Sequence, residues 1–256
     1  MPTIGIAGSR LEIVRLLSTQ PVEGVAPIVF LHEGLGSVSL WRDFPQRVAD
    51  ATGAEVIVYS RAGYGRSDPI REPRGVRYMH DEALIVLPEL LDRLGIDRPI
   101  LFGHSDGGSI ALIHAGGAGR PVSGLIVLAP HVMVEDLSVA SIAEAKVAYE
   151  TTDLKARLAR HHADVESAFR GWNDIWLHPD FRGWSIEEYL PRIDCPVLAI
   201  QGHDDEYGTM EQIDRIARQG RDVELLKLAD CGHSPHRDQP EAVIESVTRF
   251  VDRITA

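Results

Sequence analysis

Cysteine and long apolar runs are both scarce in this chain of 256 residues. Its two cysteines, Cys195 and Cys231, are too few for the disulfide framework of a small secreted domain. No stretch approaches the roughly 18 apolar residues of a membrane-spanning helix. The opening residues MPTIGIAGSRLEIV also lack the basic and then apolar layout of a signal peptide. We therefore expect a cytoplasmic protein that does not enter a membrane.

Positive charge is in the minority, because 26 lysines and arginines stand against 38 aspartates and glutamates and give a net charge of -12. An acidic surface repels phosphate backbones and anionic lipids, so we expect a small-molecule substrate and no nucleic-acid or membrane partner. The composition is otherwise that of an ordinary globular protein, and a chain of this length can form a core without a metal or disulfide. No sequence feature indicates the oligomeric state.

Short apolar runs alternate with longer amphipathic stretches along most of the chain. This alternation predicts an α/β fold, with a mostly parallel sheet covered by helices on both faces. Pro88 is expected to kink one of the helices. The strands are expected at residues 11–17, 27–31, 55–59, 99–102, 124–128, 196–201 and 223–228, and the helices at residues 40–51, 78–94, 107–115, 210–218 and 241–254.

The segment 131–193 breaks this alternation, because it is rich in helical sequence and contains no predicted strand. A structureless loop of that length would be unusual in a compact domain. We therefore expect a helical insertion over the sheet edge where the loops gather. Residues 1–130 and 194–256 would then form the core domain.

The run ILFGHSDGGSIALIHA joins an apolar strand to a helix through a G-x-S-x-G pattern at residues 103–107. Ser105 is expected on a sharp, strained turn whose flanking positions must be glycine, since a Cβ there would collide with the strand or the helix. The following helix adds partial positive charge and free backbone N–H groups beside the hydroxyl. The pattern predicts a nucleophilic serine. The alternative is that Ser105 only caps the helix.

A nucleophilic serine needs a base, and the base needs a carboxylate that orients it. Among eleven histidines, His233 follows a predicted strand and precedes the last helix. Gly232 before it lets the chain turn in tightly. His233 is therefore the predicted base, and His236, just behind Pro235, is the alternative.

The carboxylate is expected after a different strand. Residues 202–206 read GHDDE and contain three consecutive carboxylates. Such a run is often a solvated turn, but the carboxyl ends of strands are also where an α/β sheet builds its site. Asp204 and Asp205 both fit this reasoning.

The segments GHSDGG, GHDDEYG and GHSPHRDQP, in that order and spacing, resemble the nucleophile, acid and histidine motifs of α/β-hydrolase-fold enzymes. LHEGLGSVSLW and YSRAGYGRSDP are also similar to segments of that family, and the resemblance covers nearly the whole chain. It implies an eight-stranded, mostly parallel sheet in which the insertion at 131–193 caps the site. It also selects Asp205 over Asp204 as the acid.

The resemblance further implies an oxyanion hole, formed by backbone N–H groups that stabilise a developing negative charge. This chain departs from the family's usual His-Gly-x segment, because it reads His32-Glu33-Gly34. The alignment makes the main-chain amides of Gly34 and Asp106 the donors, and an alignment shifted by one residue would replace Gly34 with Leu35. Glu33 is either a specificity group for a polar substrate or a structural residue that holds neighbouring loops.

Together these residues predict a serine hydrolase without metal or cofactor, in which Ser105, His233 and Asp205 cleave a small or medium carboxylic ester or lactone through an acyl-enzyme. The resemblance equally admits carbon–carbon bond hydrolysis of dienoic ring-cleavage products. Two alternatives belong to other classes. One is a non-catalytic receptor on the same fold. The other is a divalent metal site, which no familiar ligand spacing supports, built from His203, Asp204, His233 and His236.

Overall fold

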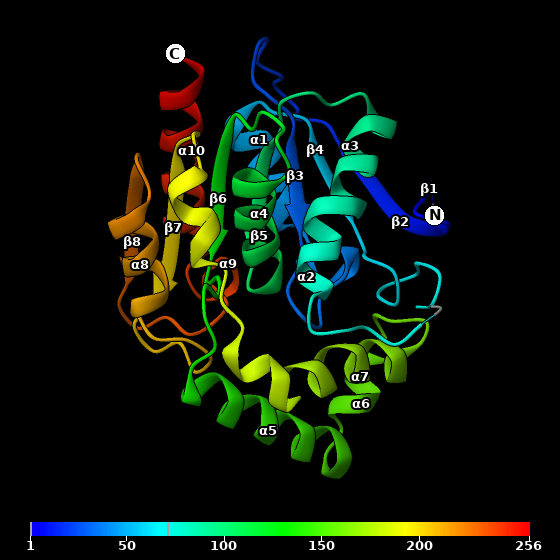
Figure 1. The fold of residues 1–256 in the computed structure, drawn as a ribbon. Coiled ribbons are helices and arrows are strands. Elements are labelled where there is room, and N and C mark those ends of the chain that lie inside the picture. The colour runs from blue at the N-terminus through cyan, green and yellow to red at the C-terminus, as the bar shows by residue number, and fades with distance from the viewer. Residues whose placement is uncertain (1, 71) are drawn as a thin grey trace.

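The computed structural model describes residues 2–70 and 72–256, and an eight-stranded sheet runs through its centre (Figure 1). The order across the sheet is β1-β2-β4-β3-β5-β6-β7-β8, and all neighbours are parallel except the pairs β1–β2 and β2–β4. This confirms the predicted fold class. The strands are β1 (Thr3–Ile6), β2 (Ser9–Leu16), β3 (Ile28–Leu31), β4 (Val56–Tyr59), β5 (Ile100–His104), β6 (Gly124–Leu128), β7 (Val197–Gly202) and β8 (Val223–Leu228).

The central strands β3, β5 and β6 are buried at every position because both faces of the sheet are covered. In β3, Val29 and Leu31 join the core on one face, whereas Ile28 and Phe30 join the core on the other. All four side chains are buried. The uninterrupted apolar runs in the sequence therefore follow from the period of two along a strand.

Helices form a layer on each face of the sheet (Figure 1). The core of one face contains residues of α1 (Phe44–Thr52) and α10 (Pro240–Thr255). The opposite core contains residues of α2 (Tyr78–Asp81), α3 (Leu87–Leu94), α4 (Asp106–Gly117) and α8 (Glu211–Gln219). The short helix α9 (Pro235–Asp238) follows the loop after β8.

Two predicted helices have interrupted backbones. The one expected at 40–51 is divided into a 3-10 turn (Val38–Trp41) and α1, with Arg42 between them at a positive φ of 55°. The one expected at 78–94 has the predicted ends, but a π-helical turn (Glu82–Val86) separates α2 from α3. That turn comes directly before Leu87 and Pro88. Proline cannot donate a backbone hydrogen bond, so an interruption of the helix is expected next to Pro88.

The segment between β6 and β7 contains the helices α5 (Asp136–Thr151), α6 (Leu154–Leu158) and α7 (Val165–Trp176). The β-pairing described within it is a single bridge between Met133 and Ser185. Figure 1 shows these three helices together at one end of the sheet. The segment begins directly after β6, so this end is the carboxyl edge of the parallel strands. No helix in the described part of the chain is long and apolar enough to cross a membrane.

The end of α4 packs closely against the 3-10 turn Glu187–Arg192. A Cβ on Gly116 would lie 2.4 Å from the backbone oxygen of Tyr189. Replacing a helical glycine with alanine normally stabilises a helix by about 1 kcal/mol. Overpacking a tight contact costs about 1–3 kcal/mol. The steric cost of the added methyl group therefore outweighs the gain in helix propensity.

We therefore expect Gly116→Ala to lower the melting temperature, as measured by thermal unfolding. Gly5→Ala is the control, because a Cβ at Gly5 would meet no atom within 4 Å. A higher melting temperature for Gly116→Ala would contradict the close packing of Gly116 against Tyr189.

Candidate active site

Ser105 occupies a strained turn between β5 and α4. Its φ of 51° and ψ of -118° lie in a region that residues with a side chain rarely adopt. The Ser105 N–H donates to Leu128 O at 2.9 Å, which anchors the turn on β6. Its side chain makes no capping hydrogen bond to α4. Ser105 is thus the N-cap residue of α4 by position alone, and among the described contacts its hydroxyl has no hydrogen-bond partner.

The glycines around Ser105 are required by close backbone contacts. A Cβ on Gly103 would lie 2.3 Å from Gly107 O, and a Cβ on Gly107 would lie 2.0 Å from Leu31 O. Neither backbone oxygen can move away as a flexible side chain would. The G-x-S-x-G pattern thus permits the approach of β5, α4 and the end of β3 that exposes the serine.

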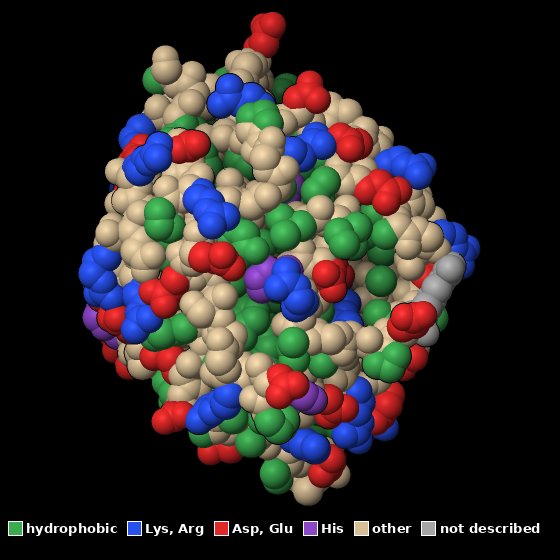
Figure 2. Space-filling view, viewed as in Figure 1, with side chains coloured by type: hydrophobic (Ala, Val, Ile, Leu, Met, Phe, Trp, Pro, Cys, Tyr) green, Lys and Arg blue, Asp and Glu red, His purple; other side chains and the backbone are tan. Residues whose placement is uncertain are grey.

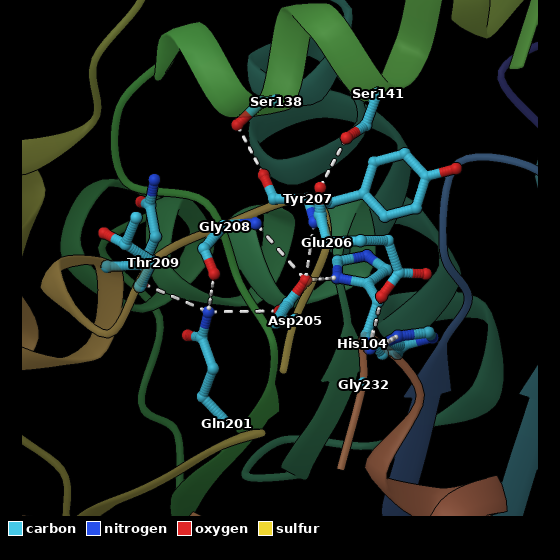
Figure 3. A network of polar contacts seen from close by, with 12 residues as sticks. His104, Ser138, Ser141, Gln201, Asp205, Glu206, Tyr207, Gly208, Thr209 and Gly232 are labelled. Carbon is cyan, nitrogen blue, oxygen red and sulfur yellow. Dashed lines mark hydrogen bonds and ion pairs between the residues drawn. The ribbon is translucent and has the colours of Figure 1, made fainter. Parts of the chain in front are cut away.

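Asp205, in the loop after β7 (Figure 3), and His233, in the loop after β8, come together at the carboxyl edge. The two side chains share a hydrogen bond of 2.8 Å between His233 Nδ1 and Asp205 Oδ1. The backbone N–H groups of Tyr207 and Gly208 also donate to Asp205 Oδ1, and Gln201 Nε2 donates to Oδ2. Four donors therefore hold this carboxylate in one orientation.

These contacts shift the pKa values of both partners. Burial opposes ionisation of Asp205, but the hydrogen bonds from His233 and the Tyr207 amide outweigh it and lower the pKa of the carboxyl. Burial likewise opposes protonation of His233, but the bond to Asp205 outweighs it and raises the pKa of the imidazole. The pair is therefore an ionised carboxylate beside a ring of increased basicity.

The alternative residues are placed differently. Asp204 is exposed, while Asp205 is buried. His236 is buried among aromatic rings, and neither of its ring nitrogens has a hydrogen-bond partner. Burial lowers the pKa of His236 well below its ordinary value. Among the described residues, no three His, Cys, Asp or Glu side chains converge to hold a metal ion.

Ser105 and His233 line the same cavity, which has a volume of about 110 Å³. Its wall is mostly apolar and includes Ile142 of α5 with Trp172 and Trp176 of α7. No hydrogen bond joins the Ser105 hydroxyl to the imidazole among the described contacts. Such bonds are often long in free enzymes and shorten when substrate binds. The structure therefore places Ser105 and His233 at one small cavity, with Asp205 bonded to His233.

Arg61 fixes the backbone of the loop after β3. The Arg61 N–H donates to His32 Nε2 at 3.0 Å, so the proton of that imidazole is on Nδ1. His32 Nδ1 then donates to the carbonyl of Glu33 at 2.7 Å, and Arg61 Nη2 donates to the same oxygen at 2.9 Å. The Gly36 N–H donates to this oxygen as well, at 3.0 Å, so three donors hold the carbonyl. The peptide plane that carries the Gly34 N–H is locked.

Arg61 also faces the residue that follows the serine. Its Nη2 lies 3.6 Å from Asp106 Oδ2, and both side chains are fully buried. Tyr78 Oη donates to Asp106 at 2.6 Å, and Trp176 Nε1 donates at 3.3 Å. Sequence reasoning missed Arg61 and Tyr78. Arg61 stands in the YSRAGYGRSDP segment, so its position within a family-like motif was the available signal.

Glu33 lies between His104 and the guanidinium of Arg237. Its carboxylate is 3.6 Å from His104 Nδ1 and 3.6 Å from Arg237 Nη2. Burial opposes its ionisation, but His104 and Arg237 outweigh burial and hold the pKa of Glu33 well below its ordinary value. These contacts connect the loop after β3 with the strand end before Ser105 and with α9. They are the contacts expected of a residue that holds neighbouring loops.

Comparison with known proteins gives one family. A family model described as the alpha/beta hydrolase family matches residues 28–246. The putative carbamate hydrolase RutD of Stutzerimonas stutzeri (strain A1501) is 28% identical over 235 residues, which cover 83% of this chain and 87% of that protein. The esterase YbfF of Escherichia coli (strain K12) is 24% identical over 260 residues, which cover 93% of this chain and 98% of that protein.

A similar solved structure is that of the proline iminopeptidase of Mycobacterium smegmatis. It aligns with a TM-score of 0.77 at 19% identity and covers 99% of this chain and 98% of that chain. At this identity the likeness shows the fold alone. The sheet, its helices and their order along the chain therefore match a solved example from end to end.

The contacts of His233 predict how its pKa responds to substitution. In the native protein, NMR titration of the ring should give a pKa above the ordinary 6.5. Asp205→Asn removes the charge that favours the imidazolium while burial remains, so the pKa should fall below 6.5. Asp204→Asn removes the same charge at an exposed position and should leave the pKa nearly unchanged. An equal fall in both variants would contradict the assigned pair.

Proposed function

The chain belongs to the alpha/beta hydrolase family and is a hydrolase, and we propose that it cleaves small uncharged carboxylic esters or lactones through a serine acyl-enzyme. The observation that carries this proposal is the 2.8 Å bond between His233 and Asp205 at a cavity that also contains the free hydroxyl of Ser105. A nucleophile, a base and an orienting acid are the parts that acyl transfer requires.

In the proposed reaction the Ser105 hydroxyl attacks the scissile carbonyl while His233 Nε2 accepts its proton. Asp205 holds Nδ1 protonated and stabilises the imidazolium that forms. His233 then delivers the proton to the leaving group, and the acyl group stays on Ser105. A water molecule attacks the acyl-enzyme by the same steps and restores the hydroxyl.

The main-chain amides of Gly34 and Asp106 are the proposed oxyanion donors. Removing one such donor typically costs about 3–4 kcal/mol of transition-state stabilisation. Two observations support Gly34. Its peptide plane is locked through the Glu33 carbonyl, and a Cβ at Gly34 would lie 2.2 Å from Trp172 Nε1, so the position tolerates no side chain. Asp106 is supported by its position directly after the serine, at the start of α4.

The cavity supports a small uncharged substrate. Its volume of about 110 Å³ leaves room for only a few heavy atoms beside Ser105. None of the described residues lining it is lysine or arginine, so the carboxylate of a dienoic ring-cleavage product would meet no cation there. Because Ile142, Trp172 and Trp176 cover it, we propose that the segment 131–193 acts as a cap. Relatives named as an esterase and as a putative carbamate hydrolase support carbonyl chemistry.

Replacing the nucleophile tests the reaction directly. We expect Ser105→Ala to lower kcat for 4-nitrophenyl acetate by about 10⁴-fold or more while the melting temperature changes little. A fluorophosphonate probe should label Ser105 in the native protein and leave the variant unlabelled. Ser234→Ala, which removes a hydroxyl next to His233, should retain activity. Near-native hydrolysis by Ser105→Ala would disprove the mechanism.

Replacing Arg61 tests the oxyanion hole. Arg61→Met removes a donor from the Glu33 carbonyl and leaves Asp106 without its buried counter-charge, a loss of about 3–5 kcal/mol in stability. The double variant Arg61→Met, Asp106→Asn removes the unpaired charge as well, and should regain most of the stability. Its kcat should stay about 10- to 100-fold low with KM nearly unchanged, because the Glu33 carbonyl still lacks one of its three donors and holds the Gly34 peptide less firmly.

Melting temperature and steady-state kinetics measure the two effects separately. Asp106→Asn alone is the control, since it keeps Arg61 on the Glu33 carbonyl. Recovery of kcat together with stability in the double variant would show that Arg61 only supports the fold.

A further inference from the structure

A second histidine lines the catalytic cavity and has no part in the proposed reaction. His131 follows β6, and only 2% of its surface is exposed. Its Nδ1 is enclosed without a hydrogen-bond partner. Among the described contacts its Nε2 has no partner either, but this nitrogen is not among the enclosed atoms, so it is the ring nitrogen that a molecule in the cavity can reach.

The backbone of His131 is fixed in place. Ser109 of α4 donates its hydroxyl to His131 O at 2.6 Å, and the same hydroxyl oxygen accepts from His131 N at 3.1 Å. The ring packs against Trp176, with 4.8 Å between centroids, and lies 5.8 Å from the ring of His233. The imidazole is therefore held beside the catalytic residues before any ligand binds.

The ring is neutral throughout the range in which the protein would work. Burial is the main cause, with a smaller contribution from His233, and together they lower the pKa of His131 to about 3. A neutral imidazole has one nitrogen that donates and one that accepts. Burying such a group without a partner is unfavourable, so a substrate group that pairs with it binds more tightly.

We propose that His131 is a substrate-binding residue that recognises a hydroxyl group close to the scissile carbonyl. Ile142 and Trp176 in the cavity wall offer no competing partner for such a group, since Ile142 is apolar and Trp176 Nε1 is already bonded to Asp106. A hydroxyl both donates and accepts, so it pairs with Nε2 in either tautomer of the ring. The favoured substrates are therefore small hydroxylated esters or lactones. This inference rests on the proposed function, because it names the substrate class of that same site.

The test compares esters in which a hydroxyl replaces a methyl group of similar size. Ethyl glycolate is paired with ethyl propionate, ethyl 3-hydroxypropanoate with ethyl butanoate, and 2-hydroxyethyl acetate with propyl acetate. The first two pairs place the hydroxyl in the acyl part and the third places it in the alcohol. The measured quantity is the ratio of kcat/KM within each pair, followed by acid release.

Native protein should prefer the hydroxyl member of at least one pair. In His131→Phe, which keeps a ring against Trp176 but removes both nitrogens, that ratio should fall by about tenfold, the value of one hydrogen bond. His131→Gln restores a donor and an acceptor and should recover part of the preference. Ile142→Val is the matched control, because it alters the same cavity wall without changing a polar group, and it should leave the ratio unchanged.

The possible results separate the inference from the proposed function. Hydrolysis of the alkyl esters with the same ratios in native protein and His131→Phe would overturn the inference and leave the serine mechanism intact. An equal fall for both members of a pair would show that His131 only packs, which also overturns it. Labelling of Ser105 without hydrolysis of any of these esters would overturn the inference alone. Absence of both labelling and hydrolysis would overturn both.

Discussion

The site depends on how closely the backbone approaches itself around Ser105. The positive φ of Ser105 costs about 1–3 kcal/mol, and it persists because the surrounding contacts leave no other path. Gly107 touches the carbonyl of Leu31, and the Ser105 N–H is bonded to β6. This contact brings the loop after β3 against the first turn of α4. The amides of Gly34 and Asp106 consequently come from two segments whose spacing cannot change without moving the serine.

Around the cavity, the buried charges of Arg61 and Asp205 are paired. Arg61 faces Asp106, and Asp205 is bonded to His233. Buried pairs of this kind contribute little net stability, because desolvation offsets the attraction. Removing one partner is costly, however, and this makes the pairs effective at holding geometry. His131 differs from them, because with no opposite charge bonded to its ring it stays neutral.

Much of the fold followed from local sequence patterns, whereas the environment of the site did not. Apolar runs such as residues 28–31 predicted buried parallel strands, because a short uninterrupted apolar run indicates a strand that is covered on both faces. The strand β1 was missed, since four residues containing a glycine carry little signal. The choice between Asp204 and Asp205 needed the family motif, as adjacent carboxylates look alike in sequence. Arg61 and His131 gain their importance from contacts between distant segments. For Arg61 the one local signal was its position within a family-like segment, and for His131 no local pattern indicates such contacts.

The segment over the cavity also supports the residues beneath it. Ser138 and Ser141 of α5 donate to the carbonyls of Tyr207 and Glu206 in the loop that carries Asp205 (Figure 3). Trp176 of α7 donates to Asp106. Lifting both helices would break all these bonds together, at about 1 kcal/mol each, and would expose the apolar wall. Figure 2 shows apolar side chains only scattered among charged ones on the face in view. The segment is therefore tied to the loop after β7 and to the first turn of α4, so the shape of the cavity depends on both.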